Sequence, residues 1–262
     1  MIRALYTSSS GMQAQQMNLD VIANNLANVN TTGFKKSKVE FQDLLYQTNR
    51  AAGSEAGAGN QVPTSLQVGH GARPVATAKI FTNGELYQTG EKMDLAIHGN
   101  GFFKVTMPDG TDAFTRDGGF KMNNSGGIVT SDGMPVTSFA GVTIPSTATN
   151  VSISPDGTVS LTDQGVTSTV GQITLSRFAN PAGMESLGSS LYRATLASGT
   201  EETGTPGLAG MGSVQQGWLE LSNVKVVEEM VNLIKAQRAY EINSKSIQAA
   251  DEMMSMSNRL RG

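Results

Sequence analysis

The chain contains no cysteine and only two histidines among its 262 residues. The absence of cysteine excludes disulfides, thiolate nucleophiles and cysteine-ligated metals, and two histidines are too few for the common zinc sites. The Walker A, HExxH and GxSxG patterns are also absent, although each would indicate phosphate-binding, metalloprotease or hydrolase chemistry. We therefore expect a protein that is not an enzyme and that needs no metal and no cofactor.

Charge is scarce, and long apolar runs are missing. Charged residues make up 16% of the chain, below the ~25% typical of soluble proteins. The net charge of −3 gives no basic field that would attract nucleic acid. No stretch approaches ~18 apolar residues, and Met1–Ser10 has no apolar core, so we expect neither a transmembrane helix nor a cleaved signal peptide. Low charge fits a chain that hides surface in contacts with other molecules, and it also fits a β-rich secreted protein.

Isolated polar residues offer only weak candidate sites. Gly99-Asn100-Gly101 lacks the third glycine of a dinucleotide loop. Asp109 and Asp112 do not have the spacing of an EF-hand calcium loop, and we expect both to serve turns instead. The polar groups therefore give no catalytic constellation.

The C-terminal tail has a sustained seven-residue pattern of large side chains: Val226, Leu233, Tyr240, Ile247 and Met254. No proline or glycine interrupts it, so the pattern predicts one helix over residues 222–258, about 55 Å long. Ser222 and Asn223 are natural N-caps for this helix. Acidic and basic residues balance from Leu219 to Gly262, which disfavours binding to an anionic membrane.

The same seven-residue pattern occurs at the N-terminus, in Leu5, Met12, Leu19 and Leu26. It predicts a helix over residues 1–34, with Gly33 as its stop. Uncharged amide and hydroxyl side chains fill the other faces, and they can be buried at low cost when hydrogen-bonded. Seams of this kind are typical of helices that pack against partners, so these nine apolar residues are the candidate self-assembly positions. The alternative is an ordinary pair of helices inside one domain.

Residues 73–197 have a β pattern. Short alternating runs are separated by turn signals such as Asn83-Gly84, Asp109-Gly110, Asp132-Gly133 and Asp156-Gly157. The density of turns predicts an antiparallel sandwich or barrel. The fold class is therefore α+β, with long terminal helices forming a coiled-coil-like inner domain and a central antiparallel β-rich outer domain.

Two segments connect these predicted domains. Residues 35–72 include an apolar stretch at 35–46, which is undecided between helix and extended chain, and a Gly-rich insert at 47–72. Residues 198–221 form a second Gly/Thr-rich link. On composition, the insert is a linker or a disordered loop. The helical assembly domain then comprises residues 1–34 plus 222–262.

Three segments resemble the bacterial flagellar rod and hook family of axial proteins. The first is the run Ala23-Asn24-Asn25-Leu26-Ala27-Asn28-Val29-Asn30-Thr31-Thr32-Gly33-Phe34-Lys35. The second contains Gly101-Phe102-Phe103 and Thr115-Arg116-Asp117-Gly118, and the third spans 217–224 and 234–241. Lys225 stands where relatives usually have Asn or Asp. The resemblance covers both termini and the near half of the β domain, whereas residues 137–208 are generic.

The resemblance implies a structural subunit that polymerises into a hollow tube, transmits torque and is exported without signal cleavage. The insert is similar to one that marks the distal-rod branch of the family, where it stiffens the tube between subunits. Implied partners are further copies of the chain, proximal rod proteins, the hook protein and basal-body ring proteins, in a basal body spanning the periplasm to the outer membrane.

Other functions remain open: a proximal rod or hook-type subunit, or a surface-binding β domain oligomerised by its helical tails. A closed trimer of the tails requires a fully apolar seam. Here the line beside the C-terminal seam, Met230, Gln237, Ser244 and Asp251, is mostly polar. That line favours packing with several unlike neighbours.

Overall fold

The computed structural model describes residues 2–53, 62–145, 148, 150–163 and 166–259. The chain divides into two compact units. The helical unit contains residues 1–26, 37–78 and 225–262, and the β-rich unit contains residues 27–36 and 79–224. This division differs from the predicted one at three places, since residues 37–78 group with the helices, and residues 27–36 and 198–221 group with the strands.

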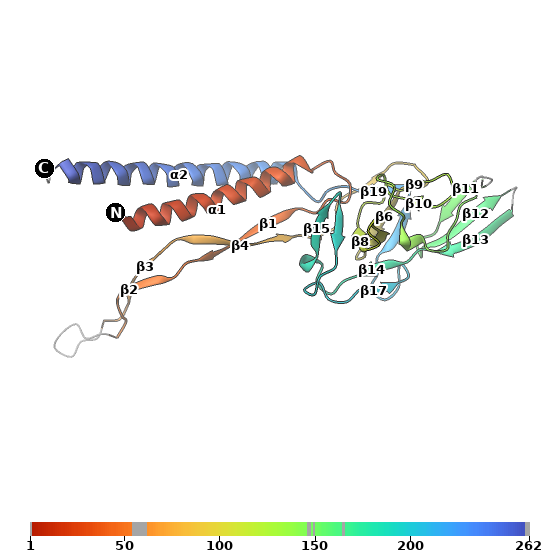
Figure 1. The fold of residues 1–262 in the computed structure, drawn as a ribbon, viewed down its shortest axis with the longest axis horizontal. Helices are drawn as coiled ribbons and strands as arrows, with labels where there is room; N and C mark the ends of the chain where they lie inside the picture. Colours follow the sequence, from red (N-terminus) through yellow and green to blue (C-terminus); the bar gives the residue numbers. More distant parts are fainter. Residues whose placement is uncertain (1, 54–61, 146–147, 149, 164–165, 260–262) are drawn as a thin grey trace. The chain divides into compact units, whose positions relative to one another are not determined.

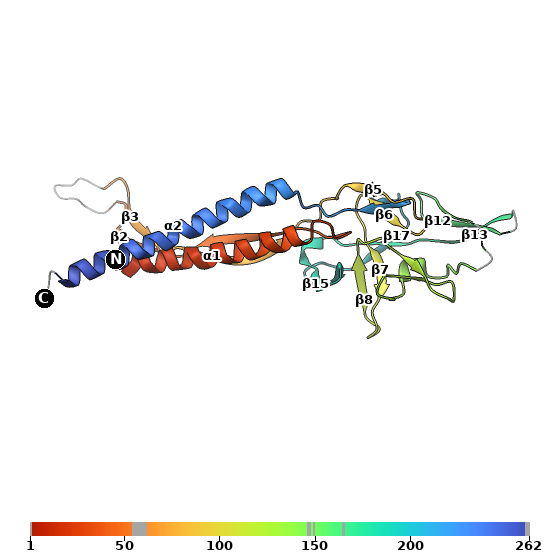
Figure 2. The same cartoon turned by 90° about the horizontal axis from the view of Figure 1, so that it is seen from above.

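The helical unit contains the two long helices, α1 (Ile2–Ala27) and α2 (Val226–Arg259). They run antiparallel and side by side in both views (Figures 1 and 2). Glu228 and Glu229 lie in the first turn of α2 and Arg259 in its last, which suits the helix dipole. Neither helix is long and apolar enough to span a membrane within the described residues.

The predicted helix ends are wrong in detail. The carbonyl of Lys225 accepts the Glu229 N–H at 3.0 Å, so α2 begins after Lys225 rather than at the predicted caps. The Asn223 side chain instead accepts the Lys36 N–H at 2.8 Å and donates to the Ile80 carbonyl at 2.8 Å. Helix α1 ends at Ala27, before the predicted stop at Gly33, because turns replace the helix at residues 28–30.

A ribbon of strands completes the helical unit: β1 (Ser37–Asp43), β2 (Tyr46–Arg50), β3 (Leu66–Gly69) and β4 (Ala72–Lys79). Strand β1 pairs with β4, and β2 pairs with β3 in antiparallel register. The expectation of a structureless insert at 47–72 is therefore wrong for its described ends, while residues 54–61 lie outside the described residues. Cross-strand pairing, which composition does not reveal, organises this segment.

The β-rich unit is built from short strands: β5 (Leu86–Gln88), β6 (Leu95–His98), β7 (Phe103–Thr106), β8 (Asp112–Thr115), β9 (Lys121–Met122), β10 (Ile128–Val129), β11 (Asn150–Ile153), β12 (Thr158–Asp163), β13 (Val166–Gln172), β14 (Leu175–Arg177), β15 (Glu185–Gly188), β16 (Leu191–Arg193), β17 (Glu202–Gly204), β18 (Ser213–Gln216) and β19 (Trp218–Glu220). Two 3-10 turns accompany them, η1 (Thr137–Phe139) and η2 (Pro181–Gly183). Every pairing with a defined register is antiparallel, which confirms the α+β class.

The predicted link at 198–221 is instead part of the β-rich unit. Strand β18 pairs with β6, placing Val214 opposite Ile97, and β19 pairs with β5, placing Leu219 opposite Tyr87. Val214 is buried in the main apolar cluster of the unit. Long-range pairing with strands more than a hundred residues earlier decides this structure, so local Gly/Thr content was misleading.

The apolar cores lie in the β-rich unit. The main cluster is formed by side chains from most of its strands, including Leu95, Ile97, Phe103, Val159, Ile173, Leu175 and Val214. Two smaller clusters centre on Phe102 and Val105. Among the described residues, no side chain of α1 or α2 belongs to any of these clusters. The helices therefore have no comparable core of their own.

Candidate assembly surface

One side of α2 is covered, and it is lined by small or polar side chains. Glu229, Ala236 and Ala250 are buried, and Asn243 at the same seven-residue spacing is half-buried. This line lies one residue before the line Met230, Gln237, Ser244 and Asp251 that the sequence analysis placed beside the seam. In a seven-residue seam, the second line of residues starts either three or four residues after the first. The predicted line starts four residues after the first residue of the seam, whereas the covered line starts three residues after it. The covered line is thus less polar than predicted.

Small residues bring the two helices together. Gly11 of α1 faces Asn243 of α2, and a Cβ atom on Gly11 would lie 2.9 Å from the Asn243 Nδ2 atom. Ala14, one turn further along α1, is 3% exposed. Side chains of this size allow close approach of the backbones but bury little apolar area. Gly11, Ala14 and Ala236 were not predicted from the sequence, although Ala236 falls two heptads before Ala250.

The nine predicted seam residues are at most partly covered. Seven are half-buried: Leu5, Met12, Leu19, Leu26, Leu233, Ile247 and Met254. Val226 and Tyr240 are exposed, at 37% and 39%. The pairing of α1 with α2 therefore leaves apolar area on every seam residue, and a further partner is needed to cover it.

The opposite side of α2 carries a second set of apolar side chains, which we name the outer stripe: Val227, Val231, Ile234, Ile242, Met253 and Met256. At ~100° per residue, Val227, Val231, Ile234, Ile242 and Met256 fall within roughly 60° of the point opposite Ala236, whereas Met253 lies to the side. All six are exposed. Exposed apolar side chains along one side of a helix make the outer stripe a candidate interaction surface.

Two asparagines of the N-terminal family motif organise the chain where α1 ends. The Asn25 side chain is buried, accepts the Ser37 N–H at 2.9 Å and donates to the Ser37 carbonyl at 2.8 Å. This pair of bonds ties α1 to the start of β1. The Asn28 side chain accepts the Thr31 hydroxyl at 3.2 Å in the turn that follows α1. Both asparagines thus fix the path of the backbone.

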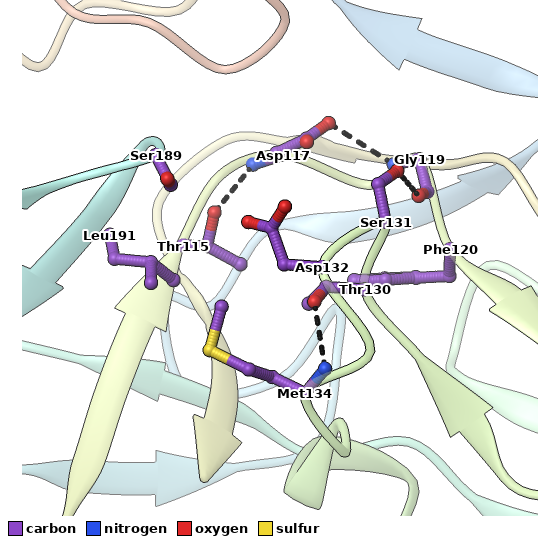
Figure 3. A pocket seen from close by; sticks show the side chains of 10 residues that line it. All are labelled: Thr115, Asp117, Gly119, Phe120, Thr130, Ser131, Asp132, Met134, Ser189 and Leu191. Atoms are coloured by element: carbon purple, nitrogen blue, oxygen red, sulfur yellow. Dashed lines mark hydrogen bonds between the residues drawn. The ribbon is translucent and has the colours of Figure 1, made fainter. Parts of the chain in front are cut away.

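Small-molecule sites are poorly developed in the described part of the chain. Figure 3 shows a cavity of about 30 Å³ whose lining includes Thr115, Asp117 and Asp132. Its polar groups serve turns, since Asp117 Oδ1 accepts the Gly119 N–H at 3.1 Å and Thr115 Oγ1 accepts the Asp117 N–H at 3.0 Å. A second cavity of about 220 Å³ lies beside Phe102. Both are below the roughly 300 Å³ at which ligand pockets begin.

No group of three or more potential metal ligands occurs among the described residues. Asp109, considered above for calcium, accepts the Thr111 N–H at 2.9 Å and the Thr111 hydroxyl at 2.6 Å. It therefore stabilises the turn between β7 and β8.

Three family models match the chain. The model for flagella basal body rod proteins matches residues 5–35. The model for the D1 domain of the flagellar hook protein FlgE/F/G matches residues 96–161, and that for the C-terminal part of flagellar basal body rod FlgEFG proteins matches residues 215–260.

Relatives match over the whole length. The flagellar basal-body rod protein FlgG of Borreliella burgdorferi is 49% identical over 265 residues, which cover 100% of this chain and 99% of the relative. FlgG of Buchnera aphidicola subsp. Acyrthosiphon pisum is 48% identical over 262 residues, covering 99% and 100%. In Caulobacter vibrioides, FlgG is 46% identical, with coverage of 99% and 100%, and the rod protein FlgF is 36% identical, with coverage of 97% and 95%.

The α+β fold, the paired terminal helices and the matched segments define a structural axial protein of the flagellar rod and hook class. The chain belongs to the flagellar basal-body rod protein family. It is a structural rod subunit of the basal body, and proteins of this class assemble into the flagellar polymer.

Proposed function

We propose that this chain is the subunit of the distal rod, a rigid hollow shaft built by polymerisation through α1 and α2. The outer stripe carries the proposal, because it leaves α2 apolar on the side opposite its partner helix. The greater identity to FlgG than to FlgF within one organism supports a distal position over a proximal one. A shaft that transmits torque needs stiffness and no active site, so the chain is not an enzyme.

Assembly is coupled to ordering of the helices. Covering an exposed Val, Ile or Met side chain fully contributes ~1.5–3 kcal/mol. Ordering the backbone costs ~1–2 kcal/mol per residue. The covered line of α2 consists of alanine and polar side chains, so burying it against α1 offsets little of the cost of ordering the backbone. Contacts with neighbouring copies supply the remainder, and α1 and α2 then form a coiled-coil-like inner wall of the tube.

The proposed roles of the other parts of the chain follow from an inner wall made of α1 and α2. The β-rich unit forms the outer wall, and the insert at 47–72 fills the space between neighbouring copies. Proximal rod proteins, the hook protein and the basal-body rings are the partners along the shaft, which extends from the periplasm to the outer membrane. The subunit is exported through the flagellar channel without a cleaved signal.

The seam is tested by Leu233→Asp and Leu19→Asp, each of which puts a charge on a half-buried apolar position. We expect purified protein to lose polymerisation while the circular dichroism of the β-rich unit is unchanged, because the apolar clusters contain no helix residue. Gln237→Asp and Gln16→Asp are matched controls, since both positions are exposed on the same helices. Normal rods from either leucine variant would refute the seam mechanism.

A further inference from the structure

Three charged side chains are buried together inside the β-rich unit. Lys35 Nζ donates to Glu220 Oε1 at 2.6 Å, and Arg116 Nη1 lies 3.6 Å from Glu220 Oε2. The exposed fractions of the three side chains are 0%, 2% and 0% for Lys35, Arg116 and Glu220. Two cations thus share one carboxylate out of contact with water.

This arrangement is costly for the fold. Burial lowers the pKa of Lys35, and the charge and hydrogen bond of Glu220 act in the opposite direction. Burial also lowers the pKa of Arg116. Arg116 Nε and Glu220 Oε2 have no hydrogen-bond partner within the described residues. Apolar residues of similar volume often give equal or greater stability than such a cluster, so it is weak evidence for stability and points to a role in specifying structure.

The cluster joins two separate stretches of backbone, which we name the N-passage (residues 27–36) and the C-passage (residues 217–224). The Gly33 N–H donates to the Glu220 carbonyl at 2.8 Å, and the Lys36 N–H donates to the Asn223 side chain at 2.8 Å. The Gly84 N–H donates to Glu220 Oε1 at 2.8 Å. Glu220 thus binds the N-passage through both its main chain and its side chain.

Glycine at position 33 allows this contact. Gly33 has a φ of +66°, and a Cβ atom there would lie 2.5 Å from the backbone nitrogen of Asp117. The Thr32 hydroxyl donates to Asp117 Oδ1 at 2.8 Å, so a side-chain hydrogen bond also holds the N-passage against Asp117. Helix α1 runs directly into the N-passage, and the C-passage leads into α2.

We infer that Glu220, with Lys35 and Arg116, is a positioning residue for assembly, because it pins together the stretch of chain that follows α1 and the stretch that precedes α2. This inference rests on the proposed assembly through those helices. The passages are fixed in the folded subunit by the β-rich unit, independently of any polymer contact. The end of α1 and the start of α2 are then attached to points whose separation is set before assembly.

Glu220→Gln and Lys35→Met test the role of the cluster. Glu220→Gln keeps the size of the side chain but leaves two buried cations without an anion. Lys35→Met removes one of the two cations and leaves the Arg116–Glu220 pair intact. Because no buried charge is then left without a partner, we expect this variant to fold even if Glu220→Gln does not. Glu202→Gln is the matched control, because Glu202 forms an exposed ion pair with Arg177 in the same unit.

The measurements are amide hydrogen exchange in the full-length monomer and the critical concentration for polymerisation of folded protein. For Lys35→Met we expect exchange in the N-passage to rise by about tenfold or more, since a charged buried hydrogen bond is lost, while β7 and β12 stay protected. We also expect Lys35→Met to raise the critical concentration for polymerisation, whereas Glu202→Gln should match the wild type in both measurements.

Two outcomes would overturn the inference. One is wild-type protection of the passages together with a wild-type critical concentration in both cluster variants. The other is an equal loss of protection in the passages, β7 and β12, which is what a purely stabilising role produces. Failure of the proposed assembly mechanism is distinguishable, because Leu233→Asp would then polymerise while its passages remain protected.

Discussion

At the scale of single residues, acidic side chains of the β-rich unit shape the turns. Asp156, between β11 and β12, accepts the Thr158 N–H at 3.1 Å and the Thr158 hydroxyl at 3.0 Å. Gly157 beside it has a φ of +81°, which suits glycine in a tight turn. The hydrogen bonds from Thr158 hold the pKa of Asp156 below its ordinary value of 3.8. The ionised carboxylate is therefore the form that the turn favours.

The lowered pKa of Asp156 predicts a pH-dependent contribution to stability. A carboxylate whose pKa is depressed in the folded state stabilises it above the unfolded pKa, and this contribution is lost as pH falls through the folded value. For Asp156→Asn we expect a lower melting temperature than wild type at pH 6 and a difference that shrinks below about pH 4. Thermal unfolding across this range measures it, with Asp132→Asn as a control that removes the same charge from another turn. A difference independent of pH would contradict the assignment.

Sequence reasoning at this scale predicted some side chains and missed others. The turn role was predicted correctly for Asp109, because that aspartate binds its own neighbours in the sequence. It was wrong for Asp112, which lies in β8 and forms an ion pair with Lys104 at 2.9 Å. Lys35, Arg116 and Glu220 were not recognised as a cluster, since they are brought together only by the fold. Gly33 was interpreted as a helix stop, whereas its conformation serves the contact with Asp117.

At the scale of elements, the long helices have the strongest sequence signal. The seven-residue pattern predicted both α1 and α2, with errors confined to their ends, because periodicity is a local property. Strands β6, β10, β11 and β12 lie within residues 73–197, where alternating residues and Gly-containing turns predicted a β-rich domain. The ribbon β2–β3 and the strands β17–β19 were missed, since their pairing partners are distant or their composition is rich in Gly and Thr.

The β2–β3 ribbon predicts a mechanical role for the insert. Its strand β3 exposes Leu66 and Val68 at 54% and 38%, and a two-stranded ribbon is marginally stable without further contacts. Deleting residues 47–67 should therefore give a polymer that bends more easily, because contacts between neighbouring copies are lost. Bending stiffness is measured from thermal fluctuations of isolated rods in electron micrographs.

A second variant separates the contacts of the insert from its length. Leu66→Ser with Val68→Ser keeps the number of residues and removes two exposed apolar side chains of the insert. We expect this variant to soften the rod in the same direction as the deletion. Wild-type stiffness in the deleted protein would remove the proposed role of the insert.

At the scale of the whole molecule, the two units differ in what stabilises them. The β-rich unit has three apolar clusters and a buried ionic cluster that joins its two passages. The helical unit has small residues on its pairing line and large apolar residues facing outward. The first unit therefore carries its own stability, and we expect the second to depend on neighbours in the polymer.

Family membership was predictable from the three matching motifs, and the matches over residues 5–35, 96–161 and 215–260 lie on the same parts of the chain. The division into units was less predictable. Residues 27–36 belong to the β-rich unit because Glu220, almost two hundred residues later, binds them. Sequence proximity to α1 gave no sign of this contact.

Hydrogen exchange of the full-length monomer, compared with the polymer, tests folding on assembly most directly. We predict fast exchange in residues 2–26 and 226–259 of the monomer and strong protection of both segments in the polymer. The N-passage and C-passage should be protected in both states, which provides an internal reference. Equal, strong protection of the helices in monomer and polymer would contradict folding on assembly, because α1 and α2 would then be a stable intramolecular pair.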